Sequence, residues 1–129
     1  LARWLGQQPD VVQVLHPALE EAPGHVHWKA LCGAAHGGQG AAAGLFSVVI
    51  DPKYGQDAVD RFCDSLQLFK LGYSWGGPIS LVVPYDIERM RSQPHAQLKA
   101  GTVVRFSIGL EQVDDLRADL AQALSQAFA

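Results

Sequence analysis

The 129-residue sequence has little cysteine and little positive charge. It contains two cysteines and ten lysines and arginines, against thirteen aspartates and glutamates, and its formal net charge is −3. Two cysteines are too few to staple a small secreted domain, so we expect Cys32 and Cys63 to be reduced and the protein to be cytoplasmic. The shortage of positive charge argues against nucleic acid as a partner, because a phosphate backbone is bound by clustered lysine and arginine.

Long apolar runs, metal motifs and nucleotide motifs are also missing. No apolar stretch approaches the roughly 20 residues that cross a bilayer, so we expect no membrane partner. The five histidines are scattered and have no cysteines or carboxylates at metal-ligand spacing, which predicts no metal site. The glycines between Gly33 and Gly44 are not followed by the Gly-Lys-Ser/Thr of a phosphate-binding loop and do not indicate a nucleotide site.

The size and composition suit a single domain. An apolar fraction of 48% in a chain of this length is enough for one core. The first residues, Leu1 to Gly6, are helix-like but lack a capping residue at their start. We therefore expect residues 1–6 to be the end of an interdomain helix, with further residues upstream, and residues 1–129 to form one domain.

Three segments have the composition of β-strands. Residues 11–15, 45–50 and 79–83 are rich in β-branched and aliphatic side chains and end at turn residues or proline. We expect the first at an edge of the sheet and the second in its centre. Pro84 is expected to end the third, because proline has no N–H for the ladder.

A fourth strand is predicted over residues 102–108 by strict alternation. Val104 and Phe106 share one face, and Arg105 lies on the other. The guanidinium is therefore expected to point away from the main apolar face of the sheet.

Helical periodicity is clearest in two places. Apolar residues follow one face of a helix over 58–66, which Asp57 is placed to cap, and over 113–127. A short helix over 23–31 fits more loosely, and residues 33–44 carry too little side-chain bulk to pack and are expected to form a mobile surface loop. The order of elements predicts an α+β, two-layer domain with a mostly antiparallel sheet covered by helices on one face.

Arg105 is the most informative candidate for a binding residue. A guanidinium can hold a carboxylate through two parallel charge-assisted hydrogen bonds, which a lysine cannot form. An arginine on the solvated face of an edge strand would give the same pattern, and the residue alone favours that simpler interpretation.

The turn at residues 73–77 is the second candidate. Tyr73, Ser74 and Trp75 precede two glycines, so the turn offers a hydroxyl, an indole and a backbone that can approach a ligand closely. Taken alone, the turn is better explained as an aromatic side chain packed over a Gly-Gly turn.

Together, these segments resemble a known family. Tyr73-Ser74-Trp75-Gly76-Gly77 is followed, in matching order and spacing, by Arg105-Phe106-Ser107-Ile108-Gly109-Leu110-Glu111 and Asp114-Asp115-Leu116. This combination is similar to the C-terminal domain of the Cys/Met-metabolism family of fold-type-I pyridoxal-phosphate enzymes. The resemblance covers nearly the whole chain, including Trp28 and the segment at 44–47.

The resemblance implies roles for four residues. In the family, the arginine matching Arg105 holds the substrate α-carboxylate and the serine matching Ser74 helps to position it, while Tyr73 and Trp75 would shape the side-chain pocket. It implies no catalytic or cofactor-binding residue in this chain, because the lysine and phosphate sites for pyridoxal 5'-phosphate belong to a preceding large domain. Residues 1–129 would be the small C-terminal domain and inactive alone.

The turn further resembles the cystathionine β-lyase branch, since the γ-lyases and γ-synthases usually carry Glu-Ser-Leu-Gly-Gly there. This implies a cytoplasmic homotetramer that acts in transsulfuration and methionine biosynthesis by cleaving cystathionine to homocysteine, pyruvate and ammonia. Pro78-Ile79 replaces a frequent aromatic-glutamate pair, and the 33–44 loop is long, so cystine or another thioether stays open as substrate. A γ-branch enzyme or a non-catalytic small-molecule-binding module would also be compatible with these residues.

Overall fold

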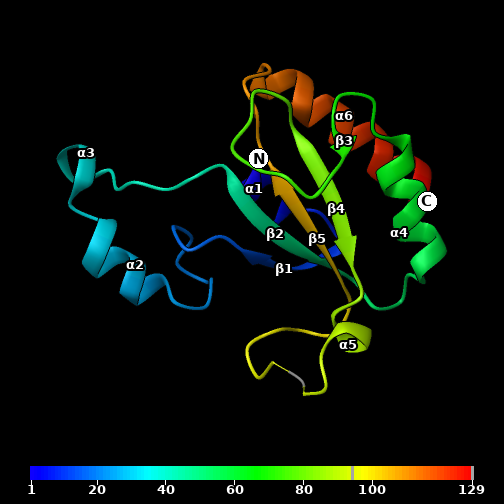
Figure 1. Cartoon of the computed structure of the whole chain (residues 1–129), viewed down its shortest axis with the longest axis horizontal. Coiled ribbons are helices and arrows are strands. Elements are labelled where there is room, and N and C mark those ends of the chain that lie inside the picture. Colours follow the sequence, from blue (N-terminus) through cyan, green and yellow to red (C-terminus); the bar gives the residue numbers. More distant parts are fainter. Residues whose placement is uncertain (94, 129) are drawn as a thin grey trace.

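A five-stranded sheet forms the centre of the computed structural model, which describes residues 1–93 and 95–128 (Figure 1). The strands are β1 (Val11–Leu15), β2 (Leu45–Ile50), β3 (Lys70–Leu71), β4 (Leu81–Tyr85) and β5 (Thr102–Ser107). Their order is β1-β2-β5-β4-β3, and each neighbouring pair is antiparallel except β3 with β4. The predicted mostly antiparallel sheet, with β1 at an edge and β2 inside, is confirmed.

The helices are α1 (Ala2–Leu5), α2 (His25–Cys32), α3 (Ala35–Gly38), α4 (Gln56–Ser65), α5 (Ile87–Met90) and α6 (Val113–Ala127). α4 and α6 pack together on one side of the sheet, whereas α2 and α3 extend away from it (Figure 1). The long C-terminal helix is confirmed. β3, α3 and α5 were not predicted, because each has four residues or fewer and is too short for a periodic pattern.

The core lies between the sheet and the pair α4 and α6, because alternate residues of the central strands are apolar. The side chains without exposed surface on this face of the sheet are Val48, Val82, Val104 and Phe106. Phe106 is central: its ring lies 5.5 Å from that of Phe46 and 5.5 Å from that of Phe69, between centroids. It also meets Phe62 of α4 edge-on at 6.5 Å, an arrangement that aromatic rings favour.

A buried carboxylate on α6 holds the connection between α4 and β3. Asp119 is 5% exposed. Its Oδ1 accepts the N–H of Gln67 at 2.8 Å, and its Oδ2 accepts those of Leu68 at 2.8 Å and Phe69 at 3.4 Å. The side-chain amide of Gln122 donates to Oδ1 at 3.1 Å. A buried charge needs such donors, so this cluster satisfies both the carboxylate and the main chain.

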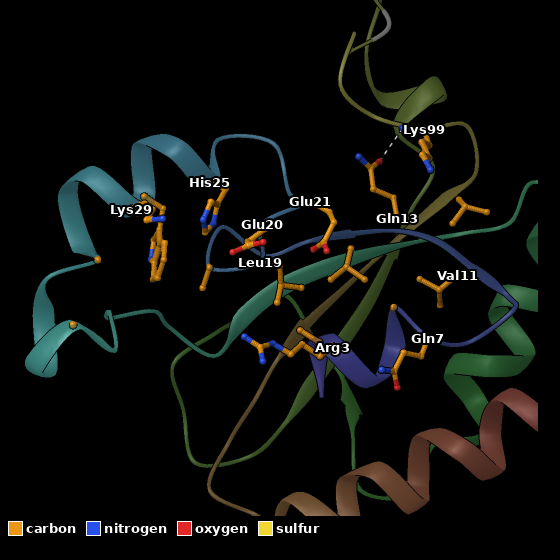
Figure 2. A pocket seen from close by; sticks show the side chains of 18 residues that line it. Arg3, Gln7, Val11, Gln13, Leu19, Glu20, Glu21, His25, Lys29 and Lys99 are labelled. Carbon is orange, nitrogen blue, oxygen red and sulfur yellow. Dashed lines mark hydrogen bonds between the residues drawn. The ribbon is translucent and has the colours of Figure 1, made fainter.

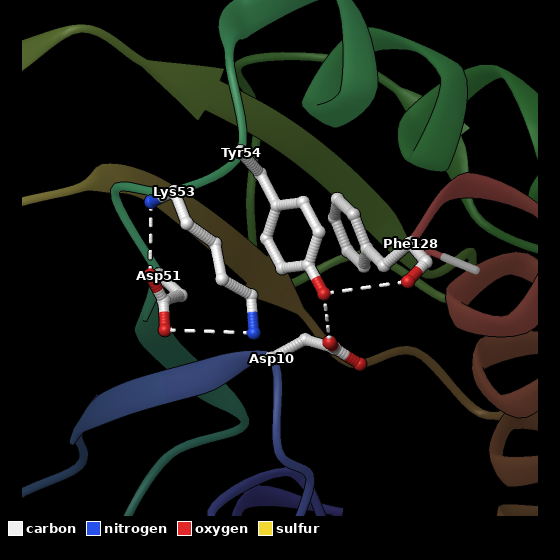
Figure 3. A network of polar contacts seen from close by, with 5 residues as sticks. All are labelled: Asp10, Asp51, Lys53, Tyr54 and Phe128. Atoms are coloured by element: carbon white, nitrogen blue, oxygen red, sulfur yellow. Dashed lines mark hydrogen bonds and ion pairs between the residues drawn. The ribbon is translucent and has the colours of Figure 1, made fainter.

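Tyr54 joins three segments at one corner of the domain (Figure 3). Its hydroxyl donates to Oδ1 of Asp10 at 2.6 Å and lies 3.3 Å from the carbonyl oxygen of Phe128, whose ring is 4.4 Å away between centroids. The hydrogen bond to Asp10 raises the pKa of Tyr54 above its ordinary value. The segment before β1 is thereby tied to the end of α6.

The structure differs from the sequence prediction at the start of α4 and at both ends of β4, which begins at Leu81 rather than at Ile79. Asp57 does not cap α4, because Gly55 is the N-cap residue. Asp57 lies in the first turn, where its negative charge still interacts favourably with the helix dipole. Pro84 does not end β4, which continues to Tyr85. β3 pairs with only the first two residues of β4, so at Pro84 the strand is an edge and a missing N–H is tolerated.

The 33–44 segment lies at the surface, as predicted, but has local structure. It contains α3, in which His36 and Gly37 have left-handed φ angles of 51° and 69°. The indole N–H of Trp28 donates to the carbonyl of Ala41 at 2.8 Å. A main-chain acceptor therefore replaces the side-chain packing that this segment cannot supply. The short helix predicted nearby is α2, which begins at His25 rather than two residues earlier.

The two free cysteines are expected to differ in reactivity. Burial, reinforced by the nearby carboxylates of Asp60 and Asp64, raises the pKa of Cys63 to about 12. Because the thiolate is the reactive form, iodoacetamide at mildly alkaline pH should label the half-buried Cys32 in the native chain and both cysteines in urea. Peptide mass analysis measures this. Equal labelling of both in the native chain would contradict the packing of α4.

Asp119→Asn should lower the free energy of unfolding by about 1–3 kcal/mol, because the amide offers one acceptor oxygen and turns an N–H₂ group toward main-chain donors. Urea denaturation measures the change. Asp114→Asn is the matched control on the same helix, since the Asp114 side chain is 84% exposed and should contribute less than about 0.5 kcal/mol. Equal losses in the two variants would show that Asp119 does not hold the connection.

Candidate functional site

Arg105 lies on the face of β5 opposite the aromatic core, as its alternation with Val104 and Phe106 predicts. Its partners in the sheet are Ser47 of β2 and Val83 of β4. The strand is thus flanked on both sides, and Arg105 is half-buried. Its position is interior to the sheet, not on the solvated edge strand of the simpler interpretation.

One nitrogen of the Arg105 guanidinium is bound by the turn that follows β3. Nη2 donates to the main-chain carbonyls of Tyr73 at 2.7 Å, Ser74 at 3.3 Å and Gly72 at 3.4 Å. Nε is buried and has no hydrogen-bond partner among the described residues. A guanidinium has five N–H donors, so this contact fixes the group and leaves capacity for an anion.

Aromatic rings surround the guanidinium. Its central carbon lies 5.9 Å from the ring centre of Trp75 and 5.8 Å from that of Tyr85, within the range of cation–π attraction. The rings of Tyr73 and Tyr85 are 6.3 Å apart. Tyr73 and Trp75 are 73% and 64% exposed, so they leave apolar surface open beside the charged group.

The turn is also bound to β5 and to the residues after it. Oγ of Ser107 accepts the N–H of Gly76 at 3.2 Å, and the N–H of Leu110 donates to the carbonyl of Pro78 at 2.9 Å. Gly76 has a φ of 72°, a left-handed conformation that glycine adopts without steric cost. The path of the turn is therefore set by contacts along its length.

Ser80, fully buried, closes the turn together with Glu111. Its N–H donates to Oε1 of Glu111 and its hydroxyl to Oε2, both at 2.8 Å, while Ser80 Oγ accepts the N–H of Gly109 at 2.8 Å. A side chain at Gly109 would collide with the carbonyl oxygen of Pro78. Burial of the Glu111 carboxyl opposes its ionisation, but the hydrogen bonds from Ser80, together with that from its own main chain, outweigh burial and lower the pKa of Glu111.

The structure brings all four predicted residues together. Trp75 meets the guanidinium with its ring, whereas Tyr73 and Ser74 touch it with their carbonyl oxygens and keep their side chains exposed. Tyr85 was missed because only the register of β4 against β5 brings it to Arg105.

Ser80, Ser107 and Glu111 were given no role by the sequence analysis. Ser107 stands two residues after Arg105 on the same face of β5, which was the available signal for it. Ser80 and Glu111 carried no such signal, because their contact joins the start of β4 to the segment after β5.

These residues suit a carboxylate rather than a cofactor. The described residues that contact Arg105 include no lysine that could form a Schiff base, and Lys70, just before the turn, donates to the carbonyl of Gln67 at 2.6 Å. The site therefore does not fit pyridoxal phosphate itself. Within residues 1–93 and 95–128, no group of three or more His, Cys, Asp or Glu side chains could hold a metal ion. No helix in this part of the chain is long and apolar enough to cross a membrane.

A separate cavity of about 750 Å³ opens between α1, β1 and α2 (Figure 2). Its walls carry both signs of charge, with Arg3 and Lys29 as well as Glu20 and Glu21. None of the four predicted site residues lines it. This cavity is therefore distinct from the site at Arg105.

Comparison with known proteins identifies the relatives of the chain. The family model described as "Cys/Met metabolism PLP-dependent enzyme", where PLP is pyridoxal phosphate, matches residues 1–125. The cystathionine beta-lyase MetC of Escherichia coli K12 is 39% identical over 123 residues, which are 93% of this chain and 29% of that protein. The cystathionine beta-lyase of Salmonella typhimurium LT2 is 38% identical over 129 residues, 98% of this chain and 31% of that protein.

A solved structure gives the same result for the fold. The cystathionine gamma synthase from Xanthomonas oryzae pv. oryzae, in complex with cystathionine, superimposes with a TM-score of 0.70 at 32% identity, covering 98% of this chain and 32% of that one. The chain thus spans about a third or less of the length of the relatives it matches. The α+β, two-layer fold expected from the resemblance is confirmed. The chain belongs to the family of Cys/Met metabolism enzymes that depend on pyridoxal phosphate.

Proposed function

We propose that this chain is the substrate-carboxylate-binding domain of a carbon–sulfur lyase that cleaves cystathionine by β-elimination. The observation that carries the proposal is the Arg105 guanidinium, fixed through Nη2 by the carbonyls of residues 72–74, with a buried Nε that has no partner among the residues the structure describes. A guanidinium held this way is ready to receive a carboxylate without first being ordered.

The other residues of the site complete this role. Ser74, exposed beside the guanidinium, offers its hydroxyl to the bound carboxylate. The exposed rings of Tyr73 and Trp75 form the apolar wall along which the thioether side chain of the substrate lies. Fixing the α-carboxylate at Arg105 sets the orientation of the α-carbon, which is what this domain contributes to the reaction.

We propose that residues 1–129 are the small C-terminal domain of a longer protein and that α1 is the end of an interdomain helix. The curated relatives are about three times longer than this chain, which supports the assignment. Pyridoxal phosphate, held by the preceding domain, supplies the electron sink for cleavage of the carbon–sulfur bond. Val26 and Leu31 of α2 are 75% and 85% exposed and suit contact with that domain. From the family resemblance we also propose that the longer protein is a cytoplasmic homotetramer.

A γ-branch enzyme is the second candidate, supported by the likeness to the cystathionine gamma synthase of Xanthomonas oryzae. Tyr73 and Trp75 favour the β-branch, because the γ-branch usually carries glutamate and leucine there. The keto acid that is formed separates the two: pyruvate for β-elimination and 2-oxobutyrate for the γ-branch.

In the full-length protein, Arg105→Ala should lower kcat/KM for pyruvate release from cystathionine by about 100- to 1000-fold, because the α-carboxylate loses a charged partner. The kcat/KM of Arg105→Lys should lie between those of the wild type and Arg105→Ala, since lysine keeps the charge but cannot form the two parallel hydrogen bonds. Arg89→Ala removes an exposed arginine of α5 and is the control expected to keep full activity. Unchanged activity in Arg105→Ala would contradict the role of Arg105 as the carboxylate anchor. Absence of pyruvate release by the wild type would favour the second candidate or a non-catalytic module.

The 129-residue chain alone should release no pyruvate and bind pyridoxal phosphate weakly, because its described site offers no lysine for the cofactor. Equilibrium dialysis against the cofactor and a coupled pyruvate assay measure both properties, with the full-length protein as the positive control. Tight binding or turnover by the chain alone would contradict the assignment of the cofactor to another domain.

A further inference from the structure

The turn at 73–77 and its flanking residues, together residues 72–80, are hydrogen-bonded at both ends to one continuous segment, residues 105–111. The first residues of 72–80 bind Arg105 on β5, and the last, Ser80, binds Glu111 just beyond β5. Ser107 binds the middle of the turn at Gly76. Because both ends are attached to residues 105–111, the distance between the turn and the guanidinium is set by these attachments.

The attachment at Ser80 depends on a carboxylate. Each oxygen of Glu111 accepts a hydrogen bond from the same residue, one from the N–H and one from the hydroxyl of Ser80, both at 2.8 Å. With its hydrogen donated to Glu111, the hydroxyl oxygen faces the N–H of Gly109, which it accepts at 2.8 Å. An amide in place of the carboxylate has one acceptor and one donor group, so it cannot accept both bonds from Ser80.

We propose that Glu111 is a positioning residue for the carboxylate site. By holding Ser80, its carboxylate fixes the far end of the turn, so that the carbonyls of residues 72–74 hold Arg105 in one orientation. The inference rests on the proposed function of Arg105. Glu111 touches neither the guanidinium nor, by this proposal, the substrate, and it acts through the turn.

Asp119 offers a control for a merely structural role. It is also a buried carboxylate that accepts main-chain N–H groups, but at Gln67 and Leu68, before β3 and outside the turn. Asp119→Asn should therefore destabilise the domain without moving the carbonyls around Arg105. Glu111→Gln should loosen the turn.

Hydrogen exchange read by mass spectrometry in the full-length protein tests the positioning without need of activity. Glu111→Gln is expected to speed exchange in peptides covering 72–80 and to leave 67–69 unchanged, whereas Asp119→Asn should do the reverse. Ser80→Ala, which removes the hydroxyl but keeps the N–H bond to Glu111, is the milder variant and should show the same pattern more weakly. Unchanged exchange over 72–80 in both Glu111→Gln and Ser80→Ala would overturn the proposal.

Kinetics on the same variants test the consequence for substrate. Glu111→Gln should raise KM for cystathionine by about tenfold and leave kcat within about twofold, and it should add nothing in an Arg105→Ala background. Asp119→Asn should leave KM unchanged. An equal rise in KM in Glu111→Gln and Asp119→Asn would overturn the positioning role. So would a full effect of Glu111→Gln on KM in the Arg105→Ala background. Absence of lyase activity in the wild type would instead overturn the proposed function, and hydrogen exchange would still decide the role of Glu111.

Discussion

The segment from Gln67 to Ser80 is held by hydrogen bonds from side chains to its main chain, and the site depends on this constraint. β3 has two residues, so a sheet ladder can satisfy few of the N–H and C=O groups in this stretch. Asp119 accepts the N–H groups before β3, Arg105 donates to the carbonyls after it, and Glu111 accepts at its end. Without these charged partners the main-chain groups of this stretch would need water to satisfy them.

The residues that stabilise the fold and those that are open to a ligand lie on opposite faces of β5. On one face of β5, Phe106 packs in a fully buried aromatic cluster that fixes the strand. On the other face, Arg105 and Ser107 use that fixed strand to hold a turn whose own side chains stay exposed. The exposed Tyr73 and Trp75 are therefore free to contact a ligand, because they contribute little to holding the fold.

Much of the fold was predictable because the signals are local. The alternation in residues 102–108 placed Arg105 on the correct face, and the apolar stripe over 113–127 predicted α6. The family resemblance brought the turn and Arg105 together. The extension of β4 through Pro84 and the approach of Tyr85 to Arg105 could not be predicted, because both depend on which strand lies beside which.

Because the turn is hydrogen-bonded along its length, the number of residues in it is also fixed. Contacts at Tyr73, Gly76, Pro78 and Ser80 leave no stretch of it free to take up an inserted residue. The 33–44 segment is held less closely: the indole of Trp28 bonds to Ala41, and only at its ends does Gly33 donate to the carbonyl of Lys29 and Gly44 accept the N–H of Ile108. Insertions and deletions over the course of evolution can therefore accumulate in that segment, while the turn beside Arg105 can change in residue type but not in length.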